Sequence, residues 1–104
     1  MKKEIINVAL CEGRHQIPEA VDGSIFPQVI ENPTDIYALE EEAFIFFDSV
    51  LYPAIKRPRV ANIYVTGMTV ALIATLNVAR RENILVTLFH YDRETGEYFP
   101  QQVV

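Results

Sequence analysis

The segment of the sequence best suited to binding chemistry is Thr66-Gly67-Met68-Thr69, which stands between an apolar run and a helical pattern. Backbone amides are free at the start of a helix, and such amides bind anions such as phosphate. Gly67 would let a phosphate approach the backbone, and Thr66 or Thr69 could donate a hydroxyl hydrogen bond. A structural explanation stays open beside this one, in which Thr69 caps the helix and Gly67 permits a tight turn.

Two other points of the chain supply a positive charge and imidazole rings. Arg14 and His15 follow the first apolar run, where they could bind the same anion, although a solvated loop explains them as well. His90 stands near the end of a third apolar run and could bind a ligand or transfer a proton, with a structural role in a hairpin as the alternative. The predicted ligand-binding residues are Arg14, His15, Thr66, Gly67, Thr69 and His90.

Catalytic residues stay unassigned, and the sequence leaves open whether the chain is an enzyme. Cys11 lies inside an apolar run, no serine stands in a nucleophile elbow, and two histidines do not make a metal site. The chain contains neither a GxGxxG fingerprint nor a Walker-type lysine, so we expect no metal and no cofactor. If the chain cleaved a phosphodiester bond, Glu12, His15 and His90 would be the groups available for proton transfer.

The elements that must position these residues alternate between strands and helices. Runs of β-forming residues predict strands at 5–11, 61–66 and 84–91, and the first of these should be covered on both faces. Helical spacing predicts one helix that is capped by Asn32 and ends near Tyr52, and another over about 70–81. Residues 17–23 should form a short helix, 24–30 an irregular or edge segment, 53–59 a surface connection, and 98–104 an antiparallel strand after a turn.

This order of elements predicts a small three-layer Rossmann-like α/β domain that spans residues 1–104. Its sheet should be mainly parallel, with the carboxyl-terminal strand added as an antiparallel hairpin. Ligands of such sheets lie outside the carboxyl ends of the strands. The three loops that carry the candidate residues should therefore meet at one edge.

Composition narrows the classes of partner and compartment. A net charge of −5 argues against binding to duplex nucleic acid or to anionic membranes. Cys11 is the single cysteine, so no internal disulfide can form and a reducing compartment is expected. No secretion signal is recognised, and no apolar stretch reaches the roughly 20 residues that a membrane span needs. We therefore expect a cytoplasmic protein.

The segment Ile63-Tyr64-Val65-Thr66-Gly67-Met68-Thr69 resembles the strand-to-helix turn of CARF-like domains, the small Rossmann-like sensors of cyclic oligonucleotides in CRISPR-associated systems. The resemblance covers this segment and the order of the elements. It implies a homodimer with its ligand across the strand-end loops and with Thr66, Gly67 and Thr69 facing phosphate. Arg14 and His15 match only by their place after the first strand. The resemblance is compatible with a stand-alone protein that binds the cyclic oligonucleotide, with one that sequesters it (a sponge), and with a small nuclease that opens its ring.

Two functions follow as predictions. The leading one is a ligand-binding module for a phosphate-bearing small molecule, such as a nucleotide or a cyclic oligonucleotide. The alternative is a homodimeric protein-interaction or assembly module without a small-molecule ligand. It rests on the free strand edge at 98–104 and on four aromatic residues that give the first helix more apolar surface than one sheet covers. These are Phe44, Phe46, Phe47 and Tyr52.

Overall fold

The computed structural model describes residues 2–53 and 58–103, which form a five-stranded sheet and two helices. The strands are β1 (Ile5–Cys11), β2 (Ser24–Phe26), β3 (Arg59–Tyr64), β4 (Ile84–Asp92) and β5 (Glu97–Gln102). The helices are α1 (Ile36–Val50) and α2 (Thr69–Arg81). Most of the expected connection at 53–59 lies outside the described residues.

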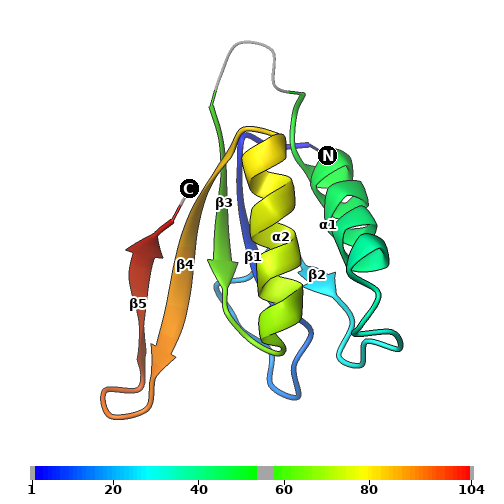
Figure 1. Cartoon of the computed structure of the whole chain (residues 1–104). Coiled ribbons are helices and arrows are strands. Elements are labelled where there is room, and N and C mark those ends of the chain that lie inside the picture. Colours follow the sequence, from blue (N-terminus) through cyan, green and yellow to red (C-terminus); the bar gives the residue numbers. More distant parts are fainter. Residues whose placement is uncertain (1, 54–57, 104) are drawn as a thin grey trace.

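The sheet has the order β2-β1-β3-β4-β5, and its first four strands are parallel. β5 pairs with β4 in the antiparallel direction. The predicted α/β class, the mainly parallel sheet and the carboxyl-terminal hairpin are therefore confirmed, and the fold is compatible with a small Rossmann-like domain. All four parallel strands end at the same edge of the sheet, at the bottom of Figure 1.

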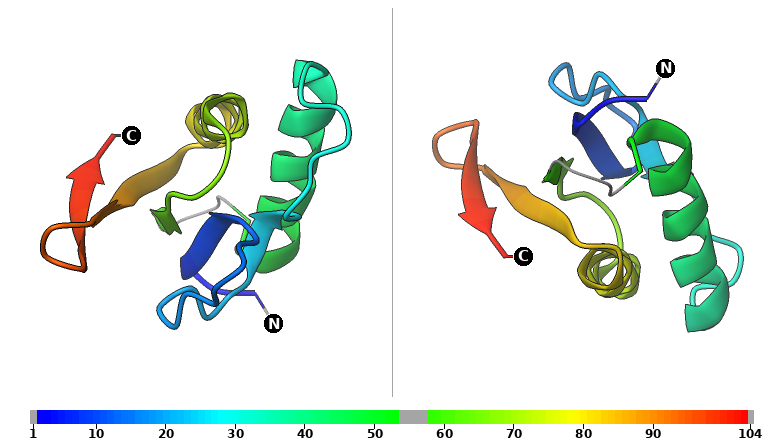
Figure 2. Two further views of the ribbon diagram at one scale, coloured as in Figure 1. Left: turned by 90° about the horizontal axis from the view of Figure 1, so that it is seen from below. Right: turned by 90° about the horizontal axis from the view of Figure 1, so that it is seen from above.

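The arrangement of layers differs from the expected one. α1 and α2 lie side by side against the same face of the sheet, as both views in Figure 2 show. The chain crosses from β2 over β1 to β3 through α1 and from β3 to β4 through α2, both in one direction, so right-handed crossovers place both helices on that face. The step from β1 to β2 runs the other way, but residues 12–23 between them contain turns and no helix. No helix of the described residues therefore covers the second face, which we call the open face.

Alternating burial along β1 shows the difference between the two faces. Ile6, Val8 and Leu10 are fully buried beneath the helices, whereas Ile5 on the open face is 54% exposed. The expectation that this strand is covered on both sides was wrong for its amino-terminal half. The chain between β1 and β2 lacks the helix that would cover that half.

Local sequence signals predicted most of the helices and strands. Two of these predictions were wrong. α1 is capped by Asp35, whose carboxylate accepts a hydrogen bond from the Ala38 amide at 3.1 Å, and not by Asn32. The backbone carbonyl of Asn32 instead accepts a hydrogen bond from the Asp35 amide, in a turn that contains Pro33. The short helix expected at 17–23 is absent because the segment forms successive turns, which lead into the edge strand β2.

Candidate functional site

The turn between β3 and α2 lies at the carboxyl edge of the sheet, where the sequence placed the leading binding site. Thr66 does not point freely toward solvent there. Its hydroxyl donates to the Cys11 carbonyl at 2.7 Å and accepts from the Cys11 amide at 3.2 Å. The side chain thus extends the ladder between β1 and β3 beyond the last backbone pair, Ala9 with Tyr64. This gives Thr66 a structural role in holding the two strand ends together.

Gly67 is required at its position for two separate reasons. Its φ is +84°, a conformation that residues with a side chain rarely adopt. A Cβ added here would also lie 2.6 Å from the Cys11 sulfur, which is closer than atoms in van der Waals contact approach. The turn therefore packs directly on the end of β1.

The start of α2 leaves its backbone donors available. Met68 precedes the helix with φ −87° and ψ 140°, and its side chain makes no capping hydrogen bond. Thr69 is the first helical residue and is exposed, so the expectation that Thr69 caps the helix was wrong. By helix geometry the amides of Thr69, Val70 and Ala71 have no partner within the helix. They lie at the electropositive end of the helix, where Thr69 is exposed, Val70 is half-buried and Ala71 is buried.

The thiol of Cys11 lies beneath this turn and is not a reactive group. The residue is only 4% exposed, and burial raises the pKa of the thiol, with a smaller opposing effect from a hydrogen bond with the Met68 backbone. A neutral buried thiol is a poor nucleophile. Cys11 therefore acts as packing between β1 and the β3–α2 turn.

Arg14 and His15 lie in the loop after β1 and line an open groove of about 620 Å³. The groove runs between this loop and β2, and residues such as Gly13, Ser24 and Phe26 complete its wall. Both side chains are exposed, so they are free to contact a ligand. Thr66, Gly67, Thr69 and His90 are not among the residues that line the groove. The structure brings Arg14 and His15 together, but it does not join them with the other candidates in one cavity.

His90 makes its contacts with β5. Its Nε2 lies 2.8 Å from Oε1 of Gln101, and its ring is 5.3 Å from the ring of Phe99. Gln101 and Phe99 belong to the hairpin strand, so these contacts support a structural role for this histidine.

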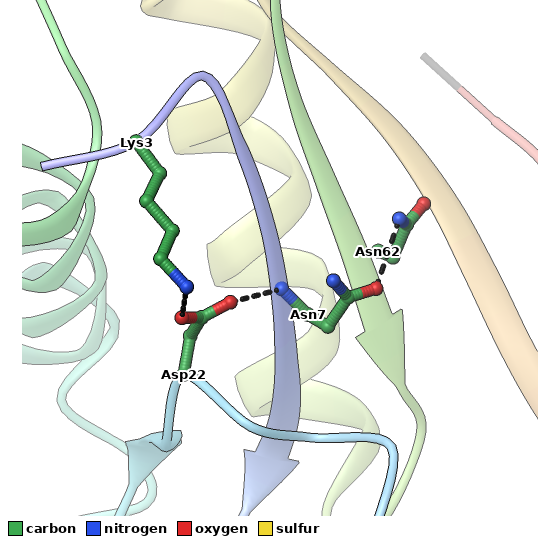
Figure 3. A network of polar contacts seen from close by, with 4 residues as sticks. All are labelled: Lys3, Asn7, Asp22 and Asn62. Carbon is green, nitrogen blue, oxygen red and sulfur yellow. Dashed lines mark hydrogen bonds and ion pairs between the residues drawn. The ribbon is translucent and has the colours of Figure 1, made fainter.

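Sequence reasoning missed a network of polar side chains around Asn7 of β1 and Asn62 of β3, which Figure 3 shows. Asp22 accepts hydrogen bonds from Lys3 at 2.6 Å and from the Asn7 amide at 2.9 Å, and Asn62 donates to the side chain of Asn7 at 3.1 Å. Burial alone raises the pKa of Asp22, but the bonds from Lys3 and Asn7 outweigh it and hold the pKa below its usual value. The available signal was an asparagine inside each of two apolar runs.

A group of aromatic rings lies at the carboxyl end of the open face. Tyr64 stacks on Phe89 with ring centres 4.8 Å apart, and the ring of Tyr98 meets Tyr64 edge-on at 5.0 Å. Burial raises the pKa of both tyrosines, and the charge of Glu19 raises them further. Glu19 belongs to the segment between β1 and β2, so this segment extends over the aromatic end of the face.

The aromatic residues of α1 do not all add to the surface. Phe47 is fully buried in the core, and Phe46 packs against the core with its ring edge-on to Phe47. Phe44 is exposed, and so is Tyr52, which lies beyond the end of α1 at Val50. The predicted aromatic surplus of this helix is therefore about half of what the sequence pattern indicated.

Comparison of this chain with protein-family models, with curated proteins and with solved structures found no match. Within the described ranges 2–53 and 58–103, neither helix is long and apolar enough to cross a bilayer. The same residues contain no cluster of three or more His, Cys, Asp or Glu side chains that could hold a metal ion.

Proposed function

We propose that this chain is a binding module for a phosphate-bearing small molecule, held at the carboxyl edge of the parallel sheet. The observation that carries the proposal is the uncapped start of α2, where the first backbone amides follow a positive-φ glycine directly after a strand. Free amides and the helix dipole favour an anion at such a point. Arg14 and His15 belong to the loop that leaves the adjacent strand β1, which supplies a positive charge at the same edge.

A nucleotide or a cyclic oligonucleotide is the class of ligand we favour. This choice rests on the resemblance of segment 63–69 to the strand-to-helix turn of CARF-like domains, whose ligands are of this kind. In this proposal Thr66 and Gly67 shape the turn, and the amides at Thr69 and beyond contact phosphate. A cytoplasmic location, in which the single thiol stays reduced, fits the same proposal.

Thermal-shift measurements with nucleoside monophosphates and cyclic oligonucleotides test the proposal. A ligand that binds the folded chain raises the unfolding temperature. We expect Arg14→Ala to weaken that rise, while Arg80→Ala, an exposed arginine at the opposite end of α2, should leave it unchanged. Flat curves with every ligand, or equal losses in both variants, would contradict the proposal.

A pair of substitutions at Thr69 separates the backbone amide from the hydroxyl. Thr69→Pro removes one amide donor, yet proline is well tolerated at the first position of a helix. The extended ψ of 140° at Met68 is also what a residue before proline requires. A hydrogen bond to a charged group contributes about 1.5–3 kcal/mol. We therefore expect Thr69→Pro to weaken binding about tenfold or more, and Thr69→Ala to weaken it less.

A second candidate function, a homodimeric interaction or assembly module without a small-molecule ligand, is favoured by the apolar surface that stays exposed on the open face. Large apolar side chains such as Ile5, Leu85 and Tyr91 are exposed there. This candidate predicts self-association without ligand, and it would explain uniformly flat thermal-shift curves.

A further inference from the structure

A second groove lies along α1, between the helix and the chain that leads into it from β2. It has a volume of about 570 Å³ and shares only Pro27 with the groove that Arg14 and His15 line. The residues that line it include Leu39, which is buried in the core, and Ile30, which packs against the core. The groove is therefore built on the packed part of the fold.

Large apolar side chains stay exposed around this groove. Val29 on the leading segment is 73% exposed and Ile45 on α1 is 56% exposed, and both line the groove. Tyr37 and Phe44 are exposed as well, and they line a neighbouring groove on α1, with Glu41 common to the two. Apolar side chains that gather at one place on a surface mark a site of interaction, whereas scattered ones do not. The fold itself leaves this apolar surface along α1 uncovered.

The charged side chains that line the groove all carry the same sign. They are Glu31, Glu41 and Glu42, all exposed, and no Lys, Arg or His is among the described residues that line it. The adjacent Glu40 is paired with Arg81, with its Oε1 2.6 Å from Nη1 of the arginine. Within the described part of the chain, no ion pair involves the three groove glutamates. A cleft with apolar walls and charges of one sign concentrates its electric field, so this groove attracts cations.

The apolar and the acidic side chains together select one class of partner. A metal ion or a polyamine would use the glutamates, but neither carries large apolar groups to cover Val29 and Ile45. A second copy of this chain has a net charge of −5 and is repelled by an acidic groove. A protein segment that carries large apolar side chains together with Lys or Arg matches both properties of the groove.

We propose that the groove along α1 is a docking site for a basic amphipathic helix of a partner protein. The apolar side chains of the partner fill the groove between Val29 and Ile45. Its Lys or Arg side chains pair with Glu31, Glu41 and Glu42. This docking needs no phosphate ligand, so it is independent of the function proposed above.

The wall that α1 forms favours a helix as the docked segment. Glu41 and Ile45 lie one helical turn apart on α1, so they belong to one ridge of side chains. Ridges with this spacing pack into the grooves of a second helix. Amphipathic helices bind apolar grooves through large side chains every three or four residues. Such a helix places its charged side chains beside the apolar ones, as the glutamates of this groove require.

Fluorescence anisotropy with a labelled model peptide tests this docking without any phosphate ligand. The peptide contains Leu and Lys at the spacing of an amphipathic helix, and a second peptide has Glu in place of each Lys. Wild-type protein should bind the Leu/Lys peptide, and added salt should weaken the binding because it screens exposed charges. Glu41→Lys and Glu42→Lys should each weaken it about tenfold or more, because like charges then meet. Ile45→Ser should also weaken it about tenfold, because an apolar contact is lost.

Two control variants change the same properties elsewhere on the surface. Glu94→Lys changes the net charge by the same amount as Glu41→Lys, but Glu94 is exposed in the β4–β5 turn, on the far side of the molecule from α1 (Figure 1). Leu85→Ser removes an exposed apolar side chain from the open face, as Ile45→Ser does from α1. Both controls should leave the affinity for the Leu/Lys peptide unchanged. A control that lost as much affinity as its counterpart on α1 would overturn the proposal.

The double variant Glu41→Lys with Glu42→Lys distinguishes an altered site from a misfolded chain. It should lose affinity for the Leu/Lys peptide and gain affinity for the Leu/Glu peptide, a reversal that misfolding does not produce. Wild-type protein that fails to bind the Leu/Lys peptide would contradict the proposal. Spermine that binds the wild-type chain as tightly as the peptide does would contradict it as well, because the apolar side chains of the groove would then play no part.

Discussion

The contact between Gly67 and Cys11 makes a sharp prediction about how the candidate site is held. Gly67→Ala introduces a methyl group 2.6 Å from the Cys11 sulfur and 2.9 Å from its Cβ. It also forces alanine into a backbone conformation with φ +84°. Both effects act on the one turn that joins β3 to α2.

The expected cost of this substitution is the sum of the two effects. A positive φ costs a residue with a side chain about 1–2 kcal/mol. An extra methyl group in a packed region costs about 1–3 kcal/mol. We therefore expect Gly67→Ala to reduce the free energy of unfolding by roughly 2–5 kcal/mol, a large share of the roughly 5–15 kcal/mol that holds a typical native protein together.

Chemical denaturation measures this cost, and Gly23→Ala separates its two parts. Gly23 has φ +106°, but a Cβ there would meet no atom within 4 Å. Gly23→Ala should therefore show the backbone cost alone. The double variant Cys11→Ala with Gly67→Ala should recover part of the loss, because the sulfur is gone while the Cβ of residue 11 remains. If Gly67→Ala cost no more than Gly23→Ala, the packing of this turn on β1 would be refuted.

Three further substitutions test the packing and the electrostatics of the fold. Arg59 is 8% exposed and donates hydrogen bonds to the carbonyls of Tyr52 and Glu82, which follow the two helices. Arg59→Met removes these bonds and should reduce the free energy of unfolding by roughly 2–3 kcal/mol in denaturant titrations. Asp35→Ala removes the cap of α1 and should cost about 1 kcal/mol in the same assay. The pKa of Asp22 is lowered in the folded state, so its stabilising effect is present above the pKa of the unfolded chain and is lost as the pH falls through the folded value. Asp22→Asn should accordingly flatten the acid side of a plot of unfolding temperature against pH.

Local patterns predicted much of the fold because they reflect local physics. The run at 5–11 is rich in β-forming residues and forms β1 within the same bounds. The pattern over 70–81 forms α2 with one residue added at its start. Asn83 follows the end of this helix, and its φ of 57° places it in the left-handed conformation in which helices commonly end.

The layers and the site depended on contacts that no local pattern contains. The segment 17–23 has helix-compatible ends, yet it forms turns that carry the chain from β1 to the edge strand β2. The absence of a helix there leaves the open face exposed near the amino ends of its strands, where Ile5 and Leu85 lie. Thr66 was predicted to face a ligand, but its hydroxyl bonds to Cys11, which lies 55 positions away in the chain. Only the register between β1 and β3 brings these two residues together.

Backbone amide NMR is the measurement that tests the central claim most directly. Uniformly ¹⁵N-labelled protein is titrated with nucleoside monophosphates and with cyclic oligonucleotides, and the shift of each amide is followed. Binding at the carboxyl edge predicts the largest shifts at Thr69, Val70 and Ala71, with smaller ones at Arg14 and His15. Saturating ligand that moves none of these amides, or that moves only residues elsewhere in the chain, would contradict the claim.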